Sequence, residues 1–220
     1  MTRNGAIVTQ QSLRDQVLAI LRKRLAVGDM VAGELYSATA IATELGVSSS
    51  PVREALLALV EQGVMEPIRN RGFRVVPMTE RDRKDVHKLR LLIEVPTMLE
   101  LVGHPEMERR EHEFRAIAHE IVDAADRADY VAYLAGDRSF HLGLLGITGN
   151  ERLVALVENL RDQTRQGGLV SLFESGQLRD TAEEHFLILD ALMAKDSRLV
   201  ESLMVAHLDH VVADWGPADS

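Results

Sequence analysis

The segment from Gly46 to Val60 constrains the fold of this chain more than any other segment. Its sequence, GVSSSPVREALLALV, joins a glycine and three serines to a run with helical spacing. Ser50 can cap a helix, and Pro51 suits the first helical position, where its missing N–H group leaves no hydrogen bond unmade. One face of this helix is apolar and consists of Val52, Leu56, Leu59 and Val60. The segment therefore predicts the tight turn and second helix of a helix-turn-helix.

The start of this helix has the chemistry to approach DNA. Small hydroxyl residues allow a helix to come close to a sugar-phosphate backbone. Arg53 lies in the first turn, from which a guanidinium group can reach the edge of a base in the major groove. The start of this helix can therefore approach a DNA backbone and reach a base edge.

The hydrophobic period changes after this helix and predicts a β-hairpin. Residues 64–68 and 73–76 form two short strand patterns around a basic tip. Arg69, Arg71 and Arg74 can lie along or in a groove beside the one that the helix enters, and Gly72 lets backbone approach the sugar-phosphate closely. The helix and the hairpin together predict a winged helix-turn-helix.

Two further helices are expected before the turn. Residues 12–26 carry an apolar stripe and begin with Ser12 and Asp15, which resemble a capping box. This helix ends in the basic cluster Arg22–Arg24, which favours the helix dipole and can contact phosphate. The second, short helix is expected at residues 39–45.

Helical periods continue from Thr79, which forms a capping-box pattern with Asp82, to the C terminus. The expected helices cover residues 80–101, 106–126, 130–146, 150–166, 180–195 and 197–213. No strand pattern competes with them. We therefore predict a mostly α protein, with a winged helix-turn-helix DNA-binding domain at residues 1–78 and an antiparallel helical bundle at residues 79–220.

Charge and composition fit this division of the 220 residues. Residues 1–78 carry nine basic and seven acidic residues, a net charge of +2. Residues 79–220 carry 16 basic and 27 acidic residues, a net charge of −11, and the two parts sum to −9. No apolar run approaches a membrane span, and the first ten residues lack the apolar core of a signal peptide. We expect a cytoplasmic protein with no membrane partner, and the absence of cysteine excludes thiolate chemistry.

Four residues of the expected bundle are candidate metal ligands. Asp137 and His141 are four residues apart, so their side chains project from one face of a helix. His185 and His207 lie in the last two helices. A carboxylate and three imidazoles can close around a divalent cation, for which zinc is the first candidate and nickel or manganese are alternatives.

Three motifs of the first part resemble the winged helix of the GntR family of bacterial transcription regulators. They are LGVS at 45–48, PVREAL at 51–56 and RGFRV at 71–75. The resemblance implies a homodimer that binds a palindromic double-stranded DNA operator, usually as a repressor, through Ser48, Ser50, Arg53 and the wing near Arg71 and Gly72. Two positions depart from the family pattern, Ser49 and Thr39, where arginine is common. The operator is therefore expected to differ from the common family sequence.

The second part resembles the FCD effector domain of one GntR subgroup over roughly residues 80–212. The matching motifs are DRSFH at 137–141, TGN at 148–150, EH at 184–185, HL at 207–208, and the pair Arg90 and Glu94. The resemblance implies that Asp137 and the three histidines hold a metal that helps to bind a small organic acid effector. Arg90 is the expected partner of the effector carboxylate, because a guanidinium group can grip a carboxylate bidentately.

Several alternatives remain open at this point. Arg90 can instead form a structural salt bridge with Glu94. The same four ligands could support a metal-dependent enzyme, or they could make the chain a pure metal-ion sensor. They could also be a polar core cluster that holds no metal.

Overall fold

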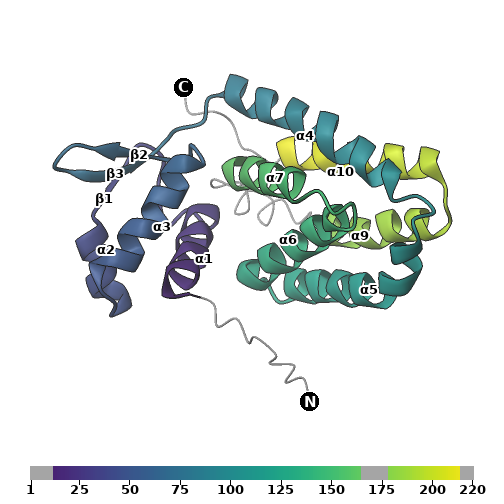
Figure 1. The fold of residues 1–220 in the computed structure, drawn as a ribbon, viewed down its shortest axis with the longest axis horizontal. Coiled ribbons are helices and arrows are strands. Elements are labelled where there is room, and N and C mark those ends of the chain that lie inside the picture. Colours follow the sequence, from purple (N-terminus) through teal and green to yellow (C-terminus); the bar gives the residue numbers. More distant parts are fainter. Residues whose placement is uncertain (1–11, 165–177, 214–220) are drawn as a thin grey trace, which may run out of the picture.

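The computed structural model describes residues 12–164 and 178–213. Figure 1 shows a small module of helices and strands on one side of the molecule and a larger group of helices on the other. We call the first part, α1 to β3, the winged-helix module and the second part, α4 to α10, the bundle. The mostly α fold with a winged helix-turn-helix and a helical bundle is as predicted.

The helices of the winged-helix module lie where the sequence places them. They are α1 (Leu13–Ala26), α2 (Ala38–Leu45) and α3 (Ser49–Glu61). The predicted cap of α1 is confirmed, because the Ser12 hydroxyl accepts a hydrogen bond from the Asp15 N–H group at 3.1 Å. Gly46 closes α2 with a left-handed φ of 67°, which turns the chain into α3.

The sheet of this module has one strand more than predicted. Strands β2 (Met65–Ile68) and β3 (Gly72–Val75) form the expected antiparallel hairpin. A third strand, β1 (Leu35–Tyr36), pairs with the other side of β3 and gives the order β1-β3-β2. Two residues are too few to carry an alternating pattern, so β1 could not be predicted from the sequence.

The six described helices of the bundle agree closely with the predicted set. They are α4 (Glu80–Glu100), α5 (Pro105–Asp126), α6 (Tyr130–Gly146), α7 (Glu151–Thr164), α9 (Leu178–Met193) and α10 (Ser197–Ala213). Residues 165 and 166, the expected end of one helix, lie outside the described residues. The Thr79 and Asp82 capping box is confirmed, with each side chain bonded to the other residue's backbone N–H group.

The bundle helices form a closed ring around a common interior. Each of α4, α10, α9, α5, α6 and α7 packs against the next, and α7 returns to α4. In Figure 1, α7 lies on the side of the bundle that faces α1 and α3. The winged-helix module has a separate hydrophobic core, built on fully buried leucines such as Leu21 of α1 and Leu56 of α3. The exact domain boundary at residues 78 and 79 stays a prediction.

Candidate functional site

The four predicted metal ligands meet in the interior of the bundle. Asp137 and His141 lie one turn apart on α6, His185 comes from α9, and His207 comes from α10. One ligand atom of each residue lies within 4.8 Å of those of the others, and all four side chains are buried. Residues up to 70 positions apart in the sequence thus converge on one point, which a cation could occupy.

Hydrogen bonds orient two of the imidazoles toward this point. The Nδ1 atom of His185 lies 2.9 Å from the Ala182 carbonyl oxygen, which can only accept, so Nδ1 carries the proton. The Nδ1 atom of His207 lies 2.7 Å from a carboxylate oxygen of Glu184 and is likewise the donor. In both residues Nε2 is therefore left with a bare lone pair, as metal coordination requires.

Two imidazole nitrogen atoms of the cluster lack a hydrogen-bond partner within the protein. The Nε2 atom of His185 has none and lies 3.4 Å from Oδ1 of Asp137, and Nδ1 of His141 is also without one. The Nε2 atoms of His207 and His141 share one hydrogen bond at 3.0 Å. A buried unsatisfied polar atom costs about 1–3 kcal/mol. A divalent cation could bind the Nε2 atoms of the three imidazoles and an oxygen of Asp137 together, so this donor set fits a metal ion.

Burial keeps the three imidazoles neutral. It lowers the pKa of His185 and that of His207 to about 4 in each case. Burial, reinforced by the positive charge of Arg161, holds the pKa of His141 well below its ordinary value. Neutral imidazole is the form that binds metals, so no proton has to leave these rings near pH 7.

A buried ionic network borders the four ligands. Arg161 of α7 donates to Oδ2 of Asp137 at 2.6 Å and to Glu94 of α4 at 3.1 Å. Arg90 donates through Nε to the other oxygen of Glu94 at 2.6 Å. Burial acts to raise the pKa of Glu94, but the two arginines outweigh it and hold this pKa below its ordinary value. Glu94 is therefore a carboxylate shared by two buried cations.

Arg90 forms the structural salt bridge with Glu94 that was one of the two alternatives from the sequence. This salt bridge does not use all the N–H donors of the Arg90 guanidinium group. Its Nη2 atom and the Nε atom of Arg161 are buried without a hydrogen-bond partner. Sequence analysis missed Arg161. It lies on α7 four residues after the buried Val157, so an arginine on the apolar face of this helix was the signal that could have revealed it.

The start of α3 differs in detail from the prediction. The N-cap is Ser48 and not Ser50, the helix begins at Ser49, and Pro51 is its third residue. The hydroxyl of Ser50 instead donates to Glu54 at 3.0 Å. The predicted cap is wrong by two positions because three consecutive serines offer equivalent caps. Proline remains tolerated, since the N–H groups of the first turn have no partner within the helix.

The predicted DNA-contacting residues of α3 lie on the surface. Ser48, Ser50 and Arg53 are exposed, and the Ser48 side chain makes no capping hydrogen bond. Arg53 has no ion pair within the part of the chain that the structure describes. These groups are available to an external partner.

The wing presents two further exposed cations, Arg69 and Arg71. They lie in the turn between β2 and β3, which a hydrogen bond from the Arg71 N–H group to the Ile68 carbonyl closes at 3.0 Å. Gly72 has a structural role that the sequence did not reveal. Its φ is +118°, and a Cβ atom here would lie 2.4 Å from the Tyr36 carbonyl oxygen of β1. Only glycine lets β1 approach the hairpin so closely.

The basic end of α1 is used within the protein. Arg24 donates to Glu44 of α2 at 2.9 Å. The Nε atom of Arg22 lies 2.7 Å from Oδ2 of Asp162 on α7, an ion pair that lacks the direction of a hydrogen bond. These two arginines therefore hold the module together and join it to the bundle, and the phosphate contact considered from the sequence is not their observed role.

Comparisons with known proteins agree with this architecture. Residues 13–75 match the model of bacterial regulatory proteins of the gntR family, and residues 85–210 match that of the FCD domain. The FCD match covers more than half of the chain. This chain belongs to the gntR family and carries an FCD domain.

The relatives that match this GntR-family chain are transcription regulators, and each match covers most of the relative's length. The HTH-type transcriptional regulator McbR of Escherichia coli K12 is 28% identical over 84% of this chain and 84% of its own length. A probable D-xylose utilization operon transcriptional repressor of Paenarthrobacter nicotinovorans is 25% identical over 91% of this chain and 88% of its own. The solved structure of E. coli McbR/YncC matches with a TM-score of 0.78 and 25% identity, covering 93% of this chain and 97% of that one.

The GntR-family chain is thus a DNA-binding transcription regulator and not an enzyme. The enzyme alternative raised by the four metal-ligand candidates is wrong, since every part of the match is to regulators. Within the described residues, no helix combines the length and apolar character that a membrane span requires.

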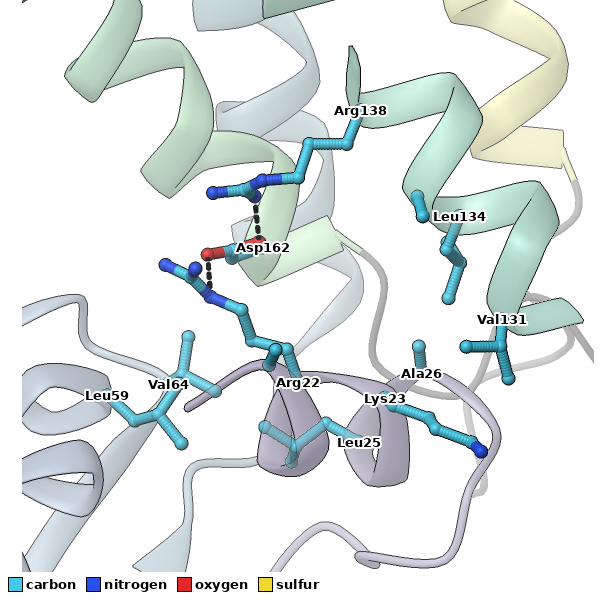
Figure 2. Close-up of a pocket in the computed structure, with 12 residues that line it drawn as sticks. Arg22, Lys23, Leu25, Ala26, Leu59, Val64, Val131, Leu134, Arg138 and Asp162 are labelled. Carbon is cyan, nitrogen blue, oxygen red and sulfur yellow. Dashed lines mark hydrogen bonds and ion pairs between the residues drawn. The ribbon is translucent and has the colours of Figure 1, made fainter. Parts of the chain in front are cut away.

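A cavity of about 200 Å³ lies between the winged-helix module and the bundle of this regulator, beside the residues through which the two parts are in contact. Its walls are mainly apolar and come from α1, α3, α6 and the segment before β2. Figure 2 shows its polar end, where Asp162 lies between Arg22 of the module and Arg138 of α6. The two parts of the chain therefore meet here through charged side chains at the edge of a gap.

Proposed function

We propose that this regulator is a ligand-responsive repressor that binds a palindromic operator as a homodimer and senses a small organic acid at a metal site in its bundle. The winged helix-turn-helix of residues 1–78 binds the DNA, and residues 79–220 bind the effector. The observation that carries the proposal is the convergence of Asp137, His141, His185 and His207 beside two buried arginines. As a DNA-binding protein, it acts in the cytoplasm.

The four converging side chains hold a divalent cation, with zinc favoured and nickel or manganese as alternatives. Three neutral imidazoles and one carboxylate form a nitrogen-rich donor set that suits zinc. Glu184 and the Ala182 carbonyl fix the ring orientation of His207 and His185 from outside the ligand set. When bound, the metal supplies a Lewis-acidic position that can take a carboxylate oxygen.

Arg90 and Arg161 supply hydrogen-bond donors that suit an anionic effector. Each has a buried guanidinium nitrogen without a partner, and a carboxylate is the ligand whose shape and charge match such a group. Glu94 and Asp137 balance the charges of the two arginines, so the positive charge that would attract an anion into this interior comes from the bound cation. The unpartnered guanidinium N–H groups beside the cation favour an organic acid over a neutral metabolite.

The surface of the module supports the DNA-binding part of the proposal. Ser48, Ser50 and Arg53 are exposed at the start of α3 and are positioned to contact phosphates and a base edge in the major groove. The exposed wing arginines and the backbone at Gly72 contact the neighbouring groove. The relatives named above include a probable repressor of a sugar-utilization operon, which favours repression.

The direct test is DNA binding measured by fluorescence anisotropy, with the DNA upstream of its own gene and a panel of carboxylates. With zinc present, at least one carboxylate is expected to change the DNA affinity five-fold or more, roughly the lower end of allosteric coupling. Chelation of the metal removes this response, and so does Arg90→Gln. A DNA affinity that follows free zinc alone would favour the pure metal sensor. No response to any carboxylate under either condition would refute the effector site.

A further inference from the structure

The last turn of α7 contacts both the metal-site residues and the winged-helix module. Arg161 points into the bundle, where it is buried and bonded to the metal-ligand candidate Asp137 at 2.6 Å. The next residue, Asp162, points out of the bundle to Arg22 of α1, with 2.7 Å between Nε and Oδ2. Two neighbouring residues of one helix turn thus connect two places that belong to different parts of the molecule.

A third consecutive residue reaches the helix predicted to enter DNA. The side-chain amide of Gln163 donates to the Gln62 carbonyl oxygen at 3.0 Å. Gln62 is the C-cap of α3, and its carbonyl is one of those that a helix end leaves without an internal partner. The end of α3 opposite to Ser48 is therefore tied to α7 directly.

Two ion pairs join α6 and α7 at this turn. Asp137 and Arg138 are consecutive on α6, and Arg161 and Asp162 are consecutive on α7. Asp137 pairs with Arg161 inside the bundle, and Arg138 pairs with Asp162 at its outer edge, at 3.2 Å. Consecutive helical residues point about 100° apart. One turn therefore carries an inner ion pair toward the metal ligands and an outer ion pair toward α1.

The surroundings of the outer ion pair leave room for movement. The 200 Å³ cavity lies next to it, so apolar side chains of α1, such as Leu25, and of α6, such as Leu134, line a gap there. Close packing resists displacement, whereas a gap beside a polar contact does not. At this edge Arg22 joins α1 to α7 through Asp162 and, at 3.6 Å, through Glu158, while Ala26 of α1 packs against the hydrophobic core of the bundle.

We propose that residues 161–163 of α7 are the transmission element that couples the metal and effector site to the DNA-binding helices. This inference rests on the proposed function. Arg161 is a positioning residue that holds Asp137. A ligand that binds to either side chain alters the hydrogen bond between them and thereby acts on the last turn of α7. Asp162 and Gln163 then carry a shift of that turn to α1 and α3. The metal site and the DNA-binding helices both contact this one turn of α7, so binding at either place can shift its position, as allosteric linkage requires.

The test measures the distance between the two parts of the molecule with and without zinc. The chain has no cysteine, so spin labels on Ala40→Cys of α2 and Ala116→Cys of α5, both exposed positions, are the only labels present. Labelled chains are diluted with unlabelled protein so that distances within one chain dominate. The probe is Zn²⁺ alone, compared with chelator, and zinc content is measured on the same samples.

In the otherwise unchanged protein, zinc is expected to shift the distance distribution. In the double variant Asp162→Asn, Gln163→Ala, the shift falls to within error of zero while zinc content stays the same. Arg22→Gln, which removes the ion pair from the side of α1 and leaves α7 unaltered, is expected to give the same loss. The matched control is Asp190→Asn, which breaks a remote ion pair with Arg115 in the bundle and keeps the full shift.

The possible outcomes separate the transmission element from the proposed function. A full zinc-dependent shift in the double variant and in Arg22→Gln would overturn the transmission role of α7. Zinc binding without any shift in the unchanged chain would overturn it as well, while the metal site would stand. Absence of zinc binding in the unchanged chain would overturn the metal site of the proposed function and the coupling together.

Discussion

The winged-helix module and the bundle place their functional polar groups in opposite environments. Ser48, Arg53 and Arg71 of the module are exposed, whereas Arg90 and Glu94 of the bundle are buried, as are the four metal-ligand candidates. Exposed polar groups keep their hydration, so they hardly change the free energy of unfolding. Buried charges lose their hydration and must be paired with an opposite charge. The exposed polar residues of the module can therefore be exchanged with little effect on folding, whereas the buried ones of the bundle cannot.

The largest expected effect is on the stability of the bundle. Glu94→Ala leaves Arg90 and Arg161 as buried cations without their shared carboxylate, so the free energy of unfolding is expected to fall by about 3–5 kcal/mol. Urea denaturation in metal-free buffer measures this loss. The matched control in the module is Glu66→Ala, which breaks the exposed pair with Arg74 and should cost at most about 1 kcal/mol. Similar losses in the two variants would abolish the contrast between the regions.

The second effect concerns DNA affinity and leaves folding unchanged. Arg53→Ala removes a predicted base contact and is expected to weaken operator binding by about 1–3 kcal/mol, or roughly 5- to 150-fold. Anisotropy titrations at fixed salt measure the affinity, and urea denaturation should give the unchanged free energy of unfolding. Arg81→Ala, an exposed arginine of α4, serves as the control and should bind DNA normally. A normal affinity in Arg53→Ala would remove α3 from the base-reading interface.

The smallest effect distinguishes phosphate contact from base contact in the wing. Arg71→Ala is expected to weaken specific and non-specific DNA equally and to lower the slope of log affinity against log salt by about one. The same titrations at several salt concentrations measure this slope. A loss confined to the specific site would instead place Arg71 on a base edge.

Most of the helices could be predicted because their signals are local. Ser12 and Thr79 each act on an N–H group three residues away, so a short stretch of sequence contains the whole interaction. The Ser48 cap was misplaced because neighbouring serines are locally equivalent. Strand β1 was missed because its two residues are fixed by pairing with β3, a contact across the chain that no local pattern encodes.

The candidate site also contains residues that a local pattern predicts and residues that no local pattern predicts. His141 and Asp137 could be paired from helical spacing, and resemblance to a known domain supplied the distant His185 and His207. Arg161 was missed because its partner Glu94 is 67 residues away and its position on an apolar face was not weighed. The inward turn of Arg22 toward α7 likewise follows from how the two parts dock, which composition and periodicity do not specify.

The most direct test of the buried metal site is the metal content of the chain purified without a histidine tag. Mass spectrometry of the digested protein is expected to find about one zinc ion per chain, since three imidazoles and a carboxylate form one site. Asp137→Ala and His185→Ala should lose the zinc, whereas His112→Ala, at an exposed position of α5, should keep it. Stoichiometric zinc that survives in Asp137→Ala and His185→Ala, or a native chain without any divalent metal, would show that the four residues are a polar core cluster.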